Sequence, residues 1–138
     1  MRKIFEFRPE AVVLHFNKGD SQRSIVDALG EPEGTTDRRH QPVTYKYGNV
    51  YFTVIEDRVA GIGIDLAANA DPSPSNIDLS NIEDIRGLSM KEVSDYFSGK
   101  HLDVAMVREG QLVLKQNPSF FISFDEEGVV DRIGIRSY

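Results

Sequence analysis

The tripeptide Ile-Gly-Ile occurs twice in this chain, at 62–64 in RVAGIGIDL and at 133–135 in VVDRIGIRS. Alternation of β-branched and small residues is typical of a strand that buries one face. The similarity extends backwards, because KGDSQRSIVDAL at 18–29 aligns without gaps with RGLSMKEVSDYF at 86–97. The repeated pattern therefore predicts a chain built from two similar halves.

Each half is predicted to start with a short helix, over 21–29 and over 89–97. Apolar residues lie on one face of both segments, and a serine stands at each start, where its hydroxyl can accept a backbone N–H bond. In the second segment Ser89 and Glu92 have the spacing of a capping box, in which each side chain caps the backbone of the other.

An antiparallel meander is predicted after each helix. Residues 43–65 indicate three strands and residues 103–135 indicate four, because apolar runs alternate with turn-forming residues. Two-residue turns at 48–49 and 56–57 are expected to fix the strand register in the first half. In the second half, turns are expected at 109–110, 116–118 and 125–128.

Neither half can bury its helix and strands well alone, so the halves are expected to share one core. The predicted fold class is α+β, with one domain over 1–138. Two tandem helix-plus-antiparallel-meander repeats, at 17–66 and 86–137, are expected to form one continuous antiparallel sheet with both helices on one face. The linker expected at 67–85 is rich in Pro, Ser, Asn and Asp. KIFEF and AVVLHF near the N-terminus predict two more strands.

Both helices open with Gly-x-Ser, and the first ends in LGEP at 29–32, where the second has FSGK. Tandem helix-plus-meander halves with these motifs resemble the β-lactamase-inhibitor-protein-like fold and its single-copy relatives, the small outer-membrane assembly lipoproteins. The resemblance covers 17–65 and 86–136. It implies the same architecture and a protein partner held on the open face of the sheet.

The second half indicates which face of the sheet is buried, because side chains in a strand alternate between the two faces. Arg132 and Arg136 share a face with Phe121, and charged side chains are rarely buried without a partner. The opposite face, which carries Ile133 and Ile135, is therefore expected to face the core.

The same assignment in the first half depends on the turn at 56–57. A regular two-residue turn puts Phe52 opposite Gly61, which places Phe52 on the open face. The residues predicted to bind a partner on this face are Tyr45, Tyr47, Phe52, Val54, Phe121, Arg132 and Arg136. The assignment turns Thr44 and Lys46 toward the core, which fits only an edge strand. The alternative is that the N-terminal strands or the linker cover this face.

Charge and composition limit the function. The chain has 16 basic and 22 acidic residues, a net charge of −6, which argues against a nucleic-acid partner and is compatible with a basic protein partner. It has no cysteine, which excludes disulfides, thiolate metal sites and a cysteine nucleophile. Charged residues interrupt the N-terminal segment and no run reaches transmembrane length, so a cytoplasmic protein without a membrane partner is expected.

No residues are spaced as a metal site, a cofactor site or a catalytic set. His15, His40 and His101 are scattered, without the close pairs that metal sites use. The glycines of Ile-Gly-Ile lie within strands rather than at a strand-to-helix turn, so they do not predict a phosphate-binding loop. Arg38 and Arg39, next to His40, could receive a carboxylate or a phosphate.

Three functions follow, in order of preference. The first is a non-enzymatic protein-binding module, most concretely a small cytoplasmic inhibitor or immunity-type protein whose partner is a basic toxin or enzyme. The second is a structural or assembly protein that forms a homodimer through the same face. The third is a small-ligand binder or enzyme with a pocket around His40.

Overall fold

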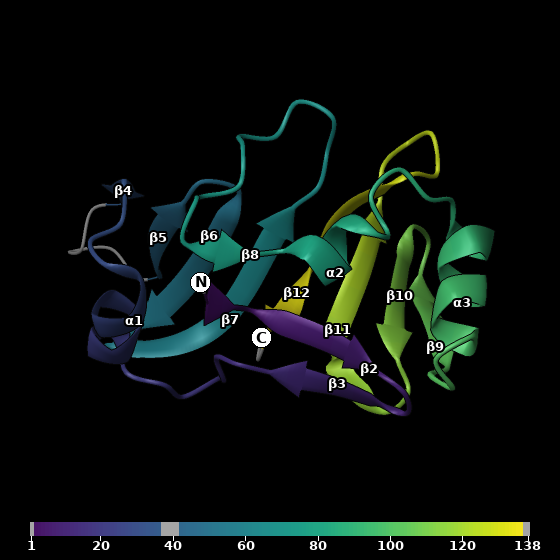
Figure 1. Cartoon of the computed structure of the whole chain (residues 1–138), viewed down its shortest axis with the longest axis horizontal. Helices are drawn as coiled ribbons and strands as arrows, with labels where there is room; N and C mark the ends of the chain where they lie inside the picture. The colour runs from purple at the N-terminus through teal and green to yellow at the C-terminus, as the bar shows by residue number, and fades with distance from the viewer. Residues whose placement is uncertain (1, 37–41, 137–138) are drawn as a thin grey trace.

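An antiparallel sheet of eight strands runs through the molecule (Figure 1), in a computed structural model that describes residues 2–36 and 42–136. Its strand order is β4-β5-β6-β7-β12-β11-β10-β9. The strands are β4 Gly34–Thr35, β5 Val43–Tyr47, β6 Val50–Ile55, β7 Arg58–Asp65, β9 Val104–Arg108, β10 Gln111–Leu114, β11 Asn117–Phe124 and β12 Val130–Arg136. The fold class is therefore α+β with a large antiparallel sheet, as the sequence predicted.

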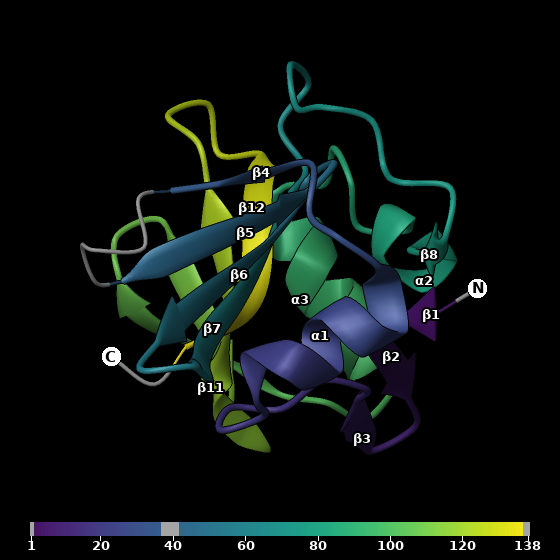
Figure 2. The ribbon, with the colours of Figure 1, turned by 90° about the vertical axis from the view of Figure 1, so that its left-hand side faces the viewer.

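The remaining elements pack on one side of the sheet, which Figure 2 shows nearly edge-on. They are α1 Gln22–Leu29, α3 Met90–Ser98, the hairpin of β2 Phe5–Arg8 with β3 Ala11–Leu14, the parallel pair of β1 Arg2–Lys3 with β8 Ile77–Asp78, and the short α2 Ser80–Glu83. Side chains of α1 and α3 belong to one hydrophobic cluster with the strands. None of the described helices is long and apolar enough to cross a membrane.

Both predicted helices are confirmed, with the caps that the sequence indicated. The Ser21 hydroxyl accepts a bond from the Ser24 backbone N–H at 3.2 Å. Ser89 and Glu92 form the complete capping box, with distances of 3.1 and 3.2 Å. Each arrangement satisfies an N–H group that the first helical turn would otherwise leave unpaired.

The two Ile-Gly-Ile segments lie side by side, where β7 pairs with β12 in the middle of the sheet. Gly63 faces Gly134, and each glycine is flanked by isoleucine pairs across the two strands. A Cβ atom on Gly134 would lie 2.0 Å from the Ile62 carbonyl oxygen and 3.0 Å from the Gly63 Cα atom. The close approach of the two strands therefore requires glycine at 134.

A β-bulge in β7 sets the orientation of the first half. Thr53 pairs with Gly61, but Val54 pairs with Val59, so Ala60 is an extra residue in β7. An extra residue shifts the register by one position and moves side chains to the other face. The second half has the same irregularity, since Asp131 is extra where β12 pairs with β11.

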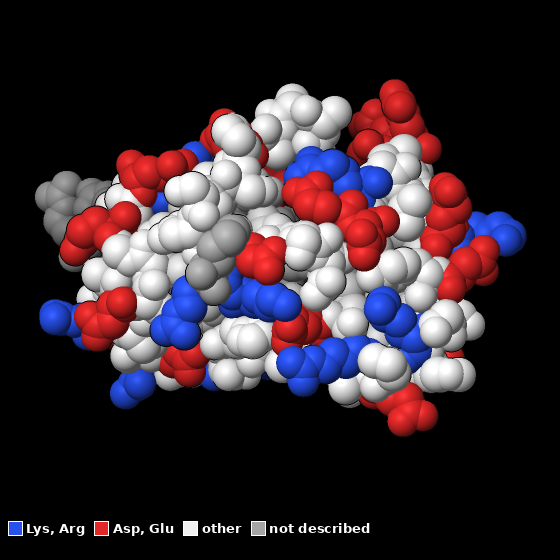
Figure 3. All heavy atoms as spheres, viewed as in Figure 1, with Lys and Arg blue, Asp and Glu red and all other residues white. Residues whose placement is uncertain are grey.

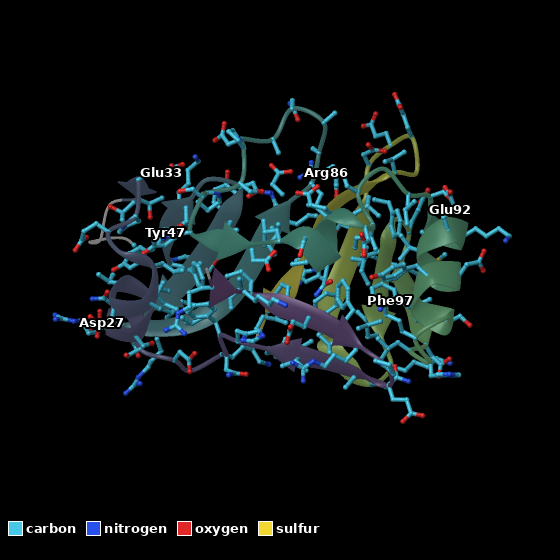
Figure 4. The ribbon with its side chains drawn as sticks, viewed as in Figure 1. Asp27, Glu33, Tyr47, Arg86, Glu92 and Phe97 are labelled. Carbon is cyan, nitrogen blue, oxygen red and sulfur yellow. The ribbon has the colours of Figure 1, made fainter. Side chains whose placement is uncertain are left out.

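Because of this bulge, the prediction that four side chains of the first half lie on the open face is wrong. These side chains are Tyr45, Tyr47, Phe52 and Val54. Phe52 faces Ile62 rather than Gly61, and the four side chains are 3%, 4%, 0% and 3% exposed. They belong to the core, with Tyr47 between α1 and the sheet (Figure 4). The Tyr47 hydroxyl donates a bond to the backbone oxygen of residue 30 at 2.9 Å, and burial raises the pKa of Tyr47 to about 12.

Thr44 and Lys46 consequently lie on the opposite face of β5, with half-buried side chains. Lys46 Nζ forms ion pairs with Asp71, at 2.7 Å, and with Glu33. This lysine therefore ties the loop that follows β7 to the segment before β4. These two polar residues were the sequence signal that this face of β5 points away from the core, because a lysine that points toward the core fits only an edge strand.

The N-terminal hairpin covers the core face of the sheet and not the opposite face. Phe7 meets Phe97 of α3 edge to face, with ring centroids 4.9 Å apart, and Phe120 of β11 at 5.6 Å. Figure 4 shows Phe97 pointing from α3 toward the strands. The segment 67–85 is more than a linker, since it contains β8 and α2 and buries Ile82 completely.

A buried carboxylate organises the hairpin. Glu6 is 8% exposed and accepts bonds from Lys3 Nζ and Arg8 Nη2, both at 2.7 Å, while His15 Nε2 lies 3.0 Å away. The hydrogen bond from Lys3, followed by the one from His15, lowers the pKa of Glu6 from 4.5 to about 2. The ionised carboxylate is thus the form that stabilises the native hairpin.

Glu6→Gln is expected to destabilise the protein at pH 7 and to lose this effect in acid. Because the pKa of Glu6 is lower in the folded state, its contribution is complete above about pH 4.5 and is lost as the pH falls toward 2. Urea denaturation of wild type and variant between pH 2 and pH 7 measures the difference. Glu126→Gln, in the exposed turn after β11, is the control. A difference that stays constant over this range would contradict the assignment.

Candidate functional site

One face of the eight-stranded sheet carries no layer of helices or strands in the described part of the chain (Figure 2). We call it the open face. Residues that face one another on neighbouring strands form a row across the middle of this face. From β5 to β10 the row consists of Lys46, Tyr51, Gly63, Gly134, Phe121 and Val113. The two glycines leave a gap between the aromatic rings of Tyr51 and Phe121.

This gap is a hollow of about 270 Å³, here called the central hollow. Gly63 lies at its floor, where an added Cβ atom would have no neighbour closer than 3.8 Å. Tyr51 of β6 and Phe121 of β11 stand on its two sides. The polar side chains that line it are Thr44, Thr53, Ser123, Arg132 and Arg136.

The two arginines come from the same strand, four residues apart, and therefore project from the same face of β12. The Arg136 guanidinium lies over the Phe121 ring, 4.3 Å from its centroid, in a cation–π contact. The Arg132 side chain passes beside Gly63, with its Cδ atom 3.8 Å from the place of an added Cβ atom. Neither arginine has an ion-pair partner among residues 2–36 and 42–136.

A second hollow of about 450 Å³ adjoins the first toward β9 and β10, and we call it the flanking hollow. Phe121 and Arg136 line both hollows. The flanking hollow adds Lys18 and Arg108, and Lys18 Nζ donates a bond to Ser119 Oγ at 3.0 Å. Val107, which is 51% exposed, forms part of its rim.

A third hollow at the other end of β12 is acidic, and it is lined by Asp65, Asp131 and Arg132 among others. One carboxylate oxygen of Asp131 is buried and has no hydrogen-bond partner among the described residues. Burial raises the pKa of Asp131 above its ordinary value. Asp131 is the extra residue of the bulge in β12, so the irregular backbone places this carboxylate there.

Three of the predicted binding residues, Phe121, Arg132 and Arg136, lie at the central hollow. The other four lie in the core, as described above. Sequence reasoning missed Tyr51 and the hydroxyl groups beside it. The alternation of polar and apolar residues in VTYKY at 43–47 was the signal that could have found them.

The remaining candidates from the sequence do not join this site. Arg38, Arg39 and His40 lie outside the described residues. His15 contacts Glu6 in the hairpin, and His101 is an exposed residue with a positive φ of 58° after α3. Across the described residues, no three His, Asp or Glu side chains come close enough to hold a metal ion together.

The comparisons with known proteins found no relative of this chain. No family model, curated protein or solved structure matches the chain.

Proposed function

We propose that this protein is a non-enzymatic binding module that holds a protein partner on its open face. The observation that carries the proposal is the central hollow, in which Tyr51, Phe121 and two arginines surround a glycine floor. Tyrosine, phenylalanine and arginine are enriched at protein interfaces, and a few such residues contribute most of the binding energy. A sheet that is uncovered on this face provides the surrounding contact area.

The size of the central hollow favours a protein partner over a small ligand. Its volume of about 270 Å³ lies just below the range of about 300–1,000 Å³ that is typical of small-molecule sites. A hollow of this size suits one inserted side chain, with the rest of the partner resting on the neighbouring strands. The flanking hollow of about 450 Å³ lies within that range, so a small-ligand binder or enzyme is the alternative to a protein partner.

A homodimer through the open face is the alternative that the crosslinking experiment below distinguishes. A two-fold dimer is self-complementary, so it would bring the same surface of both copies together. A residue meets its own equivalent only where the two-fold axis passes, and Arg132 of one copy can equally meet Asp65 or Asp131 of the other. We propose that the partner is a different protein. In the most concrete form of this proposal, the present chain is a small cytoplasmic inhibitor or immunity-type protein.

We infer in addition that the two predicted halves are structural repeats, in line with the resemblance noted from the sequence. An isolated β-bridge joins Ser21 to Arg58 in the first half, and another joins Ser89 to Val129 in the second. Both bridges connect the start of a helix to the start of the last strand of its half. The central hollow would then lie between the repeats, with one aromatic wall from each.

Photocrosslinking tests the proposed function directly. Ser123→p-benzoylphenylalanine places a crosslinker at the central hollow, and Lys91→p-benzoylphenylalanine places one on the exposed surface of α3. In cells that naturally make the protein, we expect position 123 to give a discrete heavier adduct and position 91 to give none. Mass spectrometry of the adduct then identifies the partner.

Three results would contradict this proposal. An adduct of twice the mass of the chain at position 123 would identify a homodimer. Adducts from position 91 alone, or from none of position 91, position 123 and the same crosslinker at Val107 on the exposed rim of the flanking hollow, would mean that the open face does not hold a protein partner.

A further inference from the structure

We propose that the partner segment held on the open face is acidic, with carboxylates bound by Arg132 and Arg136. This inference rests on the proposed function and specifies the chemistry of the partner. The net charge of −6 favours a basic partner, but a partner meets the local surface rather than the whole chain. The local surface is basic.

Basic side chains of the open face gather at the two adjoining hollows and end at Arg132, which faces Asp65 across β12 and β7. The central and flanking hollows are lined by four basic side chains, Lys18, Arg108, Arg132 and Arg136, and by no Asp or Glu among the described residues. On the opposite side of the molecule, acidic and basic side chains are interspersed (Figure 3). An excess of one sign at two connected hollows, in a chain with the other net sign, indicates a complementary ligand.

The Arg136 side chain is already ordered in a position from which it can bind a carboxylate. Its guanidinium rests on the Phe121 ring at 4.3 Å, so part of its conformational freedom is already lost before a partner binds. Its planar group can donate two parallel hydrogen bonds to a carboxylate, which a lysine cannot do. The hydroxyls of Thr53 and Ser123 in the same hollow can donate further bonds.

The spacing of the two arginines predicts the spacing of the partner's acidic residues. Positions 132 and 136 are separated by about 13 Å along β12, at about 3.3 Å per residue. An extended partner segment has the same rise, so acidic residues four positions apart would project to one side and reach both arginines. Residues three positions apart would point to opposite sides.

A continuous polyanion fits this surface less well than separate carboxylates. Asp65 and Asp131 line the hollow next to Arg132, so the basic surface ends there. A nucleic-acid backbone that followed β12 past Arg132 would meet these carboxylates. An acidic segment that ends at Arg132 avoids these carboxylates, whereas a continuous phosphate backbone does not.

The probe is a pair of peptides titrated into the ¹⁵N-labelled chain and followed by NMR. One is acetyl-Glu-Ser-Thr-Ser-Glu-amide and the other is its counterpart with glutamine in place of both glutamates. We expect the acidic peptide to shift amide signals of β11 and β12 around the central hollow, and the glutamine peptide to shift none. Raising the salt to 0.5 M should weaken the binding, because Arg132 is exposed and Arg136 is only half-buried.

Matched variants separate a specific site from general attraction. Arg136→Gln is expected to weaken binding of the acidic peptide by about 10-fold, as is typical for loss of hydrogen bonds to a charged group. Lys91→Gln removes the same charge from α3 and should leave the affinity unchanged. A peptide with its glutamates three positions apart should bind less tightly than the first.

Several results would overturn the acidic-partner proposal. They are equal binding of the glutamine peptide, equal weakening by both variants, no detectable binding, or inorganic phosphate that binds the hollow more tightly than the acidic peptide does. If the Ser123 crosslink to a protein persists in such a case, the protein-binding function stands and only the partner's charge is wrong. If the acidic peptide binds but neither position 123 nor position 107 gives a crosslink, the anion site stands and the protein-binding function is wrong.

Discussion

Phe52→Ala is expected to lower the free energy of unfolding by about 3–5 kcal/mol, the usual cost of removing a buried phenylalanine side chain. Phe52 is 0% exposed. Its ring packs edge to face against Phe16 at 5.5 Å and Tyr47 at 5.8 Å, so truncation leaves a cavity between the sheet and the elements that cover it. Urea denaturation of the purified variant measures the loss.

Tyr51→Ala is the matched control, because Tyr51 precedes Phe52 in β6 but points to the central hollow. Its truncation is expected to cost less than about 1 kcal/mol, as is usual for a side chain outside the core. The same variant should weaken binding of the crosslinked partner once that partner is known. A larger loss of stability for Tyr51→Ala than for Phe52→Ala would restore the face assignment that a regular turn at 56–57 predicts.

Gly134→Ala is expected to lower the free energy of unfolding by about 3 kcal/mol or more, at the upper end of what overpacking costs. The added Cβ atom would lie 2.0 Å from the Ile62 carbonyl oxygen. That oxygen belongs to the backbone of β7 and cannot rotate away, so the two central strands would have to separate. Thermal and urea denaturation measure the effect, and insoluble expression would be its extreme form.

Gly63→Ala tests whether the effect depends on packing rather than on glycine itself. An added Cβ atom at 63 would meet only the Arg132 side chain, at 3.8 Å. We expect a change within about 1 kcal/mol in either direction, because alanine also restricts the unfolded chain. Equal losses for Gly63→Ala and Gly134→Ala would show that the close approach of β7 and β12 is not the cause.

Local signals in the sequence were sufficient for the two main helices and the long strands, but not for β1, β4, β8 and α2. The capping serines, the helical spacing of apolar residues and the turn-forming pairs each act over a few residues, so they can be recognised without knowing the neighbours in space. They placed both main helices, the hairpin at 48–49 and the strands of the second half. They also placed Phe121, Arg132 and Arg136 on the open face, because charged side chains show their preference directly.

The orientation of the first half was decided by tertiary structure. Whether Ala60 is paired or extra depends on how β7 lies against β6, and both arrangements are compatible with the same two-residue turn. One extra residue moved Tyr45, Tyr47 and Phe52 from the expected binding face into the core. The local charge likewise depends on which distant residues meet, since Lys18 before α1, Arg108 of β9 and Arg136 of β12 line one hollow only in the folded chain. Residue types and local spacing determine elements, whereas strand register determines which side chains share a surface.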